Sequence, residues 1–164
     1  MGNAIGGLFE KAGHMVSYVG SDNTSAIIGD LVVLAVPYPA VAGILDNYGA
    51  AFVGKVVVDI TNPVNFDTFD DLVVPADSSA TVIFAKAVPE ARWVKGFNTT
   101  FAATLVSGQV AGKEQTRVLF ASDDADAKAI AILTEALAGS GLGVLDAGGL
   151  KRARELEALG FLQI

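Results

Sequence analysis

The sequence contains no cysteine and a single histidine in its 164 residues. The lack of cysteine excludes disulfide bonds, thiol catalysis and cysteine-ligated metals. The histidine, His14, follows Gly13, where a polar turn is expected, and it has no second imidazole with which to bind a metal. The Ser-x-x-Lys and Gly-x-Ser-x-Gly arrangements of nucleophilic enzymes are missing as well. We therefore expect no metal site, no catalytic side chain, and chemistry that a bound cofactor supplies.

Long apolar runs and an excess of positive charge are also missing. No stretch approaches the roughly 20 apolar residues of a membrane span, and the N-terminus lacks the pattern of a signal peptide. The 18 Asp and Glu residues outnumber the 11 Lys and Arg residues, which gives a net charge of −7. Nucleic acids and anionic membranes attract basic surfaces, so neither is expected as a partner. These features predict a cytoplasmic protein that acts on small molecules.

Apolar, β-branched runs alternate with helical stretches along the chain, in which 52% of the residues are hydrophobic. The predicted strands are residues 15–19, 31–36, 55–60, 92–96, 117–121 and 143–145. The predicted helices are residues 1–13, 40–52, 78–88, 125–138 and 151–162. Runs such as LVVLAV and VVVDI are typical of strands covered on both faces of a parallel sheet. The order predicts an α/β fold: a Rossmann-type doubly wound, mainly parallel sheet with helices on both faces, in one domain spanning residues 1–164.

Polar and proline-containing loops follow four of the predicted strands: GSDN at 20–23, PYPA at 37–40, TNPVN at 61–65 and NTT at 98–100. In an open α/β sheet, ligands bind in the crevice outside the carboxyl ends of the strands. The four loops together therefore predict a ligand site at one edge, although each alone could be an ordinary turn. The NTT loop offers an amide and two hydroxyls that can hydrogen-bond a carboxamide, or that cap the next short helix.

The start of the chain has the order of the second half of a dinucleotide-binding unit. A predicted helix leads into the predicted strand at 15–19, but little beyond Gly2 remains of the glycine-rich turn that would wrap a pyrophosphate. Ser21 follows that strand and could donate its hydroxyl to the 2′-phosphate of NADP. Asp22 beside it would repel a phosphate, which keeps NAD open, and a plain surface turn is the alternative.

Three charged stretches have simpler interpretations. Asp59 ends an apolar strand, but Thr61 stands where phosphoryl transfer through an aspartyl intermediate needs a second aspartate. The acidic residues 123–126 are typical of a helix N-terminus. In the last predicted helix, Arg154 and Glu157 are expected on a solvated face opposite an apolar leucine stripe. This helix ends without a stop signal. We expect either a helix that is cut in mid-course or an apolar face that packs against another segment or subunit.

Six motifs match one family in the right order along nearly all of the chain: MGNAIG, AGHMVSYVGS, GDLVVLAVPYPA, GKVVVDITNP, VKGFNTT and DAGGLKRARELEAL. With them the chain resembles the F-420-dependent NADP oxidoreductases, and most closely their bacterial dinucleotide-binding branch. The resemblance implies an oxidoreductase that binds NADP(H), or NAD(H), and passes hydride between nicotinamide and a flavin, deazaflavin or other small-molecule acceptor. In such an enzyme the protein stacks and orients two cofactors.

The resemblance also implies cofactor contacts by position. Met1 and Gly2 match the end of the glycine turn at the pyrophosphate, and Ser21 matches the serine that binds the 2′-phosphate, with Asp22 in place of a basic neighbour. The loop along the adenosine and ribose is matched by Val36, Pro37 and Tyr38, and the loops near the nicotinamide are matched by Thr61, Asn62, Pro63, Asn98 and Thr99.

The family pattern extends beyond this sequence at both ends. Its first strand with the leading glycines, and the C-terminal segment that helps to form the acceptor site and a homodimer, have no counterpart here. We therefore expect a Rossmann domain truncated at both ends, with a weakened sheet and impaired pyrophosphate binding. The alternatives are a non-catalytic dinucleotide sensor and a truncated product that binds weakly.

Overall fold

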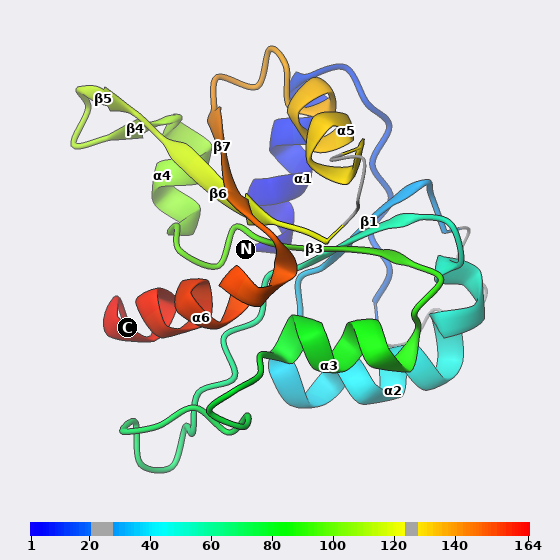
Figure 1. Ribbon diagram of the computed structural model, residues 1–164. Helices are drawn as coiled ribbons and strands as arrows, with labels where there is room; N and C mark the ends of the chain where they lie inside the picture. Colours follow the sequence, from blue (N-terminus) through cyan, green and yellow to red (C-terminus); the bar gives the residue numbers. More distant parts are fainter. Residues whose placement is uncertain (21–27, 124–127) are drawn as a thin grey trace.

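Five strands form one central sheet in the computed structural model, which describes residues 1–20, 28–123 and 128–164 (Figure 1). They are β1 (Leu31–Leu34), β2 (Val56–Asp59), β3 (Arg92–Gly96), β6 (Arg117–Ala121) and β7 (Gly143–Gly148). Their order across the sheet is β1-β2-β3-β6-β7, with β3 antiparallel to β6 and the other neighbours parallel. The predicted α/β fold with a mainly parallel sheet is confirmed.

The antiparallel pair arises from the connection between β3 and β6, which the sequence patterns did not predict. It consists of a short helix, α4 (Ala102–Ser107), and a hairpin of β4 (Gln109–Val110) and β5 (Glu114–Gln115). This connection leaves the chain at the edge where β3 ends, so β6 runs back along β3 and places Phe120 opposite Gly96. A Cβ on Gly96 would clash with the ring of Phe120, so this approach requires glycine.

One face of the sheet is covered by α1 (Gly2–Lys11), α4 and α5 (Lys128–Ala136) (Figure 1). Ile5, Leu8 and Phe9 recur on α1 at helical spacing and are buried against the sheet. From α5, Leu133 contributes to the same apolar cluster, together with strand residues such as Val94. The helix predicted at residues 1–13 is confirmed as α1.

The opposite face carries the remaining helices (Figure 1). They are α2 (Tyr38–Tyr48), the 3-10 helix η1 (Gly49–Phe52), α3 (Ala80–Ala87), the 3-10 helix η2 (Leu150–Arg152) and α6 (Ala153–Leu162). Pro39 lies in the first turn of α2, and Ser79 caps α3 by accepting the amide of Val82. The ring of Phe84 packs between Tyr38 and Trp93, with centroids 5.8 and 5.9 Å away. Helices therefore cover both faces, as predicted.

The strand predicted at residues 15–19 is wrong. The segment has no secondary structure, and its backbone makes no hydrogen bond to the backbone of another residue in the described ranges. The apolar side chains of this segment pack against the rest of the protein instead. Val16 lies against the core, and the Tyr18 hydroxyl lies so close to Gly6 of α1 that a Cβ there would clash. Alternating apolar residues predict that one side of an extended segment is buried. The segment becomes a β-strand only if a neighbouring strand forms hydrogen bonds with its backbone.

Ser122 and Asp123, which follow β6, make hydrogen bonds to other segments of the fold. The Ser122 hydroxyl donates to the Trp93 carbonyl, 2.8 Å away, and an Asp123 carboxylate oxygen accepts the Leu150 amide at 2.6 Å. Residues 124–127 lie outside the described ranges, and α5 is described from Lys128 onward. Within the described ranges, no helix is long and apolar enough to cross a membrane.

Candidate functional site

A pocket of about 280 Å³ lies at the edge of the sheet where β2 and β3 end. The loops after β1, β2 and β3 meet at this edge because the three strands are parallel. The loops after β2 and β3 form one side of the pocket, and the start of α4, the start of the chain and the end of α6 form the others. Its lining residues are Met1, Ile60, Asn62, Phe97, Asn98, Thr100, Phe101, Ala102, Gly160, Gln163 and Ile164.

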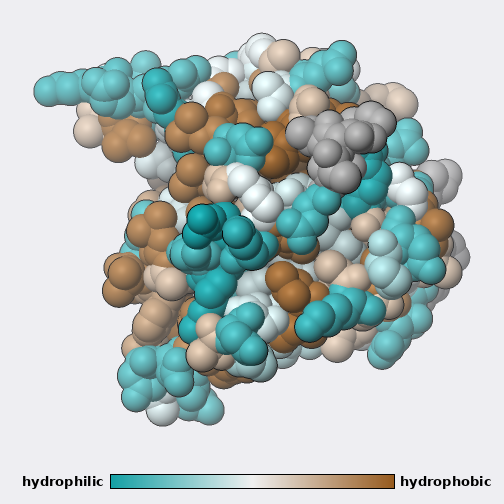
Figure 2. Space-filling view, viewed as in Figure 1, coloured by the Kyte–Doolittle hydropathy of each residue, from teal (hydrophilic) through white to brown (hydrophobic). Residues whose placement is uncertain are grey.

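Apolar side chains surround much of this pocket. Phe101 is 55% exposed at the start of α4, and Ile164 is 66% exposed beyond α6. Figure 2 shows exposed apolar surface around the C-terminal end of α6. On the apolar stripe predicted for this helix, Leu156 is buried whereas Leu162 is exposed.

Phe97 turns the chain sharply between β3 and the pocket. Its φ is +57°, in the left-handed region that side chains other than glycine rarely adopt. The ring is fully buried and packs edge-on against Phe120, with centroids 5.1 Å apart, which holds the residue in this conformation. Backbone strain of this kind concentrates at functional sites. Here it directs the next residue, Asn98, toward both the pocket and α6.

Two side-chain amides join the loops at this edge. The Asn98 amide nitrogen donates to the Asn62 side-chain oxygen at 2.9 Å and to the Leu156 carbonyl of α6 at 2.8 Å. The Asn62 amide nitrogen donates in return to the Asn98 carbonyl at 3.1 Å. Both donors of Asn98 are thus used, whereas its buried side-chain oxygen has no partner among the described residues. A buried acceptor without a donor is unfavourable, which makes this oxygen a candidate acceptor for an N–H or O–H group from outside the described residues.

The N-terminus of α1 lies at the same edge. Gly2 is close to Ala35, the residue after β1, because a Cβ on Gly2 would lie 3.5 Å from the Ala35 Cβ. The first amides of a helix have no acceptor within it, and α1 has no side-chain cap. A helix N-terminus in this state favours negative charge.

A fully buried ion cluster lies behind the pocket. Lys95 on β3 stands opposite Asp59 on β2, and its ammonium lies 3.0 Å from the Asp59 carboxylate. The same ammonium lies 3.0 Å from the Glu157 carboxylate of α6 and donates to the Thr61 carbonyl at 2.5 Å. Three acceptors thus match the three ammonium protons. Asp59 also accepts the Thr61 amide at 2.8 Å and the Thr81 hydroxyl at 2.6 Å.

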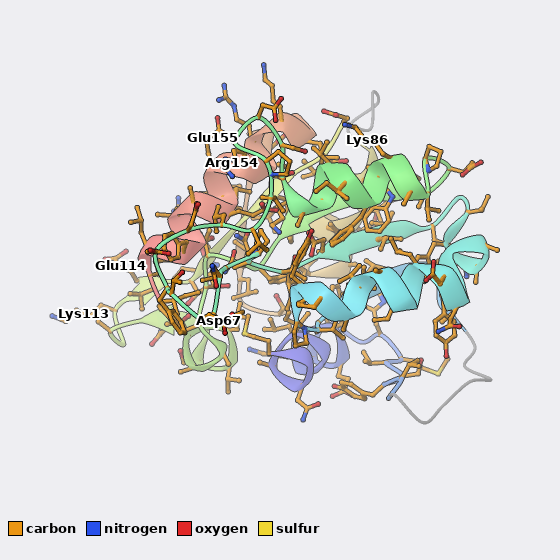
Figure 3. The ribbon with its side chains drawn as sticks, turned by 90° about the horizontal axis from the view of Figure 1, so that it is seen from below. Asp67, Lys86, Lys113, Glu114, Arg154 and Glu155 are labelled. Atoms are coloured by element: carbon orange, nitrogen blue, oxygen red, sulfur yellow. The ribbon has the colours of Figure 1, made fainter. Side chains whose placement is uncertain are left out.

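The prediction that Glu157 lies on a solvated helix face is wrong. Its side chain is fully buried, and its carboxylate accepts the amide of Ala80, the first residue of α3, at 3.1 and 3.2 Å. Burial raises the pKa of Glu157, against the opposite influence of Lys95 and the Ala80 amide. An exposed ion pair nearby joins Arg152 of η2 to Glu155 of α6, at 2.8 Å. Figure 3 shows Glu155 with its neighbour Arg154 on α6.

The structure brings Met1, which was predicted at the pyrophosphate, together with several residues that were predicted near the nicotinamide. Met1, Asn62 and Asn98 line the pocket. Thr61 is buried beside it, and its hydroxyl, like the Asn98 oxygen, has no hydrogen-bond partner among the described residues. Pro63 is buried and Thr99 is half-buried, next to the residues that line the pocket. The alternative that the NTT loop caps α4 is wrong, because α4 has no side-chain cap.

The predicted adenosine-side residues lie apart from this pocket. Val36 and Tyr38 pack against the apolar cluster of α2 and α3, and Pro37 is exposed at the start of α2. Ser21 and Asp22 lie outside the described residues.

The sequence patterns missed the apolar pocket walls and the buried charges. Asp59 and Lys95 carry a usable signal, because each interrupts an apolar strand and a buried charge must be paired. That they pair with each other depends on the register of β2 against β3, a long-range property. Glu157 gives no local signal, since its spacing also suits an exposed face.

Comparison with known proteins agrees with the fold and with the start of the chain. Residues 1–63 match a family described as "NADP oxidoreductase coenzyme F420-dependent". The crystal structure of a candidate F420-dependent NADP-reductase from Arthrobacter sp. FB24 has 31% identity and a TM-score of 0.70, over 80% of this chain. The hypothetical protein SMa0349 from Sinorhizobium meliloti has 30% identity and a TM-score of 0.62, over 79% of this chain. The chain spans 60% of the length of each of these two proteins.

No curated protein sequence matches the chain. The family match covers the first 63 residues, and the two solved structures are similar in fold over 80% and 79% of the chain. Residues 1–63 thus match the family of coenzyme F420-dependent NADP oxidoreductases, and over about four fifths of its length the chain is similar to a candidate member of that family.

Proposed function

We propose that the chain binds NADP(H) across the carboxyl ends of β1, β2 and β3, with the nicotinamide end in the pocket, and acts as an NADP(H)-dependent oxidoreductase. One observation carries the proposal: Asn98, whose buried side-chain oxygen has no partner among the described residues, is one of the residues that line a pocket with largely apolar walls. A nicotinamide has the matching chemistry, because its flat ring is apolar and its carboxamide donates N–H groups. The family match supports the same cofactor.

The size of the pocket fits one end of a dinucleotide. A volume of about 280 Å³ is at the lower limit of small-molecule sites, which span roughly 300–1,000 Å³. Phe101 and Ile60 would pack on the ring, and Asn98 would accept from the carboxamide. The uncapped N-terminus of α1 at the same edge would favour the pyrophosphate. We further propose that Pro37 and Ser21 contact the adenosine end of the cofactor, and that the chain prefers NADP over NAD.

The pocket residues serve to orient and shield rather than to transfer protons. No side chain that lines the pocket is a general acid or base. Bound NADP(H) supplies hydride chemistry, and the acceptor we propose is a flavin, a deazaflavin or another small molecule. Asn62 and Asn98 fix the geometry of the site, and Phe97, Phe101 and Ile60 keep water from it.

Fluorescence titration of the chain with NADPH and NADH tests the proposal. Phe101→Ala removes a pocket wall whose side chain is largely exposed, so the fold should be unaffected. We expect about three- to tenfold weaker NADPH binding, the range of one aromatic contact. Phe66→Ala is the matched control, because Phe66 is 57% exposed against 55% for Phe101 and does not line the pocket.

The outcomes separate the alternatives. Binding that Phe101→Ala weakens and Phe66→Ala does not, together with turnover of a flavin or quinone, supports the oxidoreductase. Binding without any acceptor would point to a dinucleotide sensor. Equal binding by the two variants would place the ligand elsewhere, and no binding by the unaltered chain would contradict the proposal.

A further inference from the structure

One buried ammonium holds both the loop and the helix that enclose the pocket. Lys95 is fully buried and has all three protons on acceptors from different segments: Asp59 of β2, the Thr61 carbonyl after β2, and Glu157 of α6. No atom of Lys95 lines the pocket. Its hydrogen bonds nevertheless reach the segments that do, since Asn62 follows Thr61 and Gly160 lies one helical turn after Glu157.

The turn after β2 is fixed from two directions. Lys95 donates to the Thr61 carbonyl, and Asp59, which Lys95 neutralises, accepts the Thr61 amide. Both backbone groups of Thr61 are therefore held by the same ion pair. This arrangement sets the position of Asn62, whose amide pairs with Asn98 in the pocket.

Helix α6, which forms one wall of the pocket, is also held by Lys95. Glu157 connects α6 to Lys95 and to the N-terminus of α3. One residue earlier, the Leu156 carbonyl accepts the Asn98 amide. The end of α6 is close enough to the turn that a Cβ on Gly160 would clash with Asn62. A shift of α6 by the width of a methyl group would therefore change the pocket.

Stability alone is a weak reason for such a cluster. Removing charges from water is costly, and well-packed apolar side chains of similar volume often stabilise a fold as well or better. Two carboxylates around one ammonium also leave an excess of negative charge, which apolar residues would avoid. What a hydrogen-bonded cluster provides, and apolar packing does not, is a fixed geometry.

We propose that Lys95 is a positioning residue of the pocket, which fixes the Thr61–Asn62 turn and α6 relative to each other through Asp59 and Glu157. For the identity of the ligand this inference rests on the proposed function; the positioning itself is a property of the protein alone. If Lys95 has this role, a substitution of Lys95 or Glu157 should disturb the pocket in proportion to the number of these hydrogen bonds that it removes. The disturbance should also exceed what the effect on overall stability explains.

The experiment compares three variants with the unaltered chain. Lys95→Met removes every hydrogen bond of the ammonium, whereas Glu157→Gln keeps an oxygen that can accept from Lys95 and Ala80. Leu133→Ala is the control for stability, because Leu133 is fully buried in α5 on the opposite face. Two quantities are measured in each folded variant: the affinity for NADPH, and the hydrogen-exchange rate of the Thr61 amide relative to amides of β6.

We expect Lys95→Met to bind NADPH at least about tenfold more weakly, since small misplacements in a site have effects of this size or larger. The Thr61 amide should exchange at least about tenfold faster relative to β6. For Glu157→Gln, the NADPH affinity and the relative exchange rate of the Thr61 amide should both stay within about threefold of the unaltered chain. Leu133→Ala should change neither the affinity nor the relative exchange rate. If Lys95→Met does not fold, Glu157→Ala, which loses both acceptors, takes its place with the same expected direction.

The two measurements separate the two proposals. Failure of the unaltered chain to bind NADPH would contradict the proposed function, and the exchange rate of Thr61 would still test the positioning role. Positioning by Lys95 is overturned if the Thr61 amide keeps its relative rate in the folded Lys95→Met or Glu157→Ala variant. It is also overturned if Leu133→Ala produces the same changes.

Discussion

The Lys95 ammonium should contribute strongly to the stability of the fold, because its removal leaves two buried charges. Lys95→Met removes hydrogen bonds of 3.0 Å to Asp59 and 2.5 Å to the Thr61 carbonyl, and a 3.0 Å ion pair with Glu157. Both carboxylates have no exposed area. Breaking a buried pair in this way costs about 3–5 kcal/mol, out of the roughly 5–15 kcal/mol that keeps a domain folded.

Urea unfolding followed by tryptophan fluorescence measures this loss. Trp93 is the only tryptophan in the chain and is buried on β3, two residues before Lys95. With a urea dependence of about 2 kcal/mol per molar, a loss of about 4 kcal/mol lowers the midpoint by about 2 M. Lys86→Met changes an exposed lysine of α3 (Figure 3) and is the matched control. It should change the free energy of unfolding by less than about 0.5 kcal/mol.

A second substitution distinguishes charge balance from lost packing. In Lys95→Met, the added change Glu157→Gln removes one of the two uncompensated charges, so the double variant should be more stable than Lys95→Met alone. Independent losses would instead make the double variant less stable. That result, or a loss below about 1 kcal/mol for Lys95→Met, would refute the reasoning.

Three further predictions concern Glu157 and two glycines. Burial raises the pKa of Glu157, so the folded state keeps this proton to higher pH than the unfolded state. Relative to Glu157→Gln, the unaltered chain should therefore lose stability as the pH rises from the pKa of Glu157 in the unfolded state through its pKa in the folded state. A difference in unfolding free energy between the two proteins that stays constant with pH, measured by urea unfolding, would contradict this. Gly96→Ala should destabilise by about 1–3 kcal/mol through its clash with Phe120. Gly7→Ala, in open space on α1, should stabilise by about 0.5–1 kcal/mol, and equal melting temperatures would refute both.

The apolar runs of the sequence contain most of the information about the sheet. A strand such as β2, buried on all four residues, needs only a continuous apolar run to be recognised. The segment at 15–19 has an alternating apolar pattern, but no strand among the described residues pairs with it. The hairpin of β4 and β5 is exposed and two residues long on each side, so it has no hydrophobic period to detect.

The position of the site could be predicted, but its internal connections could not. Parallel strands bring the loops after β2 and β3 to one edge, which places Asn62 and Asn98 together. That Glu157 turns inward depends on where α6 meets α3, a contact between residues 77 positions apart. Such long-range pairings are set by the packed fold and not by local spacing.

Side-chain amide signals test the central claim, that the pocket at the ends of β2 and β3 receives the nicotinamide end of NADP(H). The measurement is a nuclear magnetic resonance titration of the isotope-labelled chain with NADPH. We expect the side-chain amide signals of Asn62 and Asn98 to shift together and to saturate below about 1 mM NADPH. Signals that stay unchanged while NADPH binds elsewhere, or no saturable change at all, would contradict it.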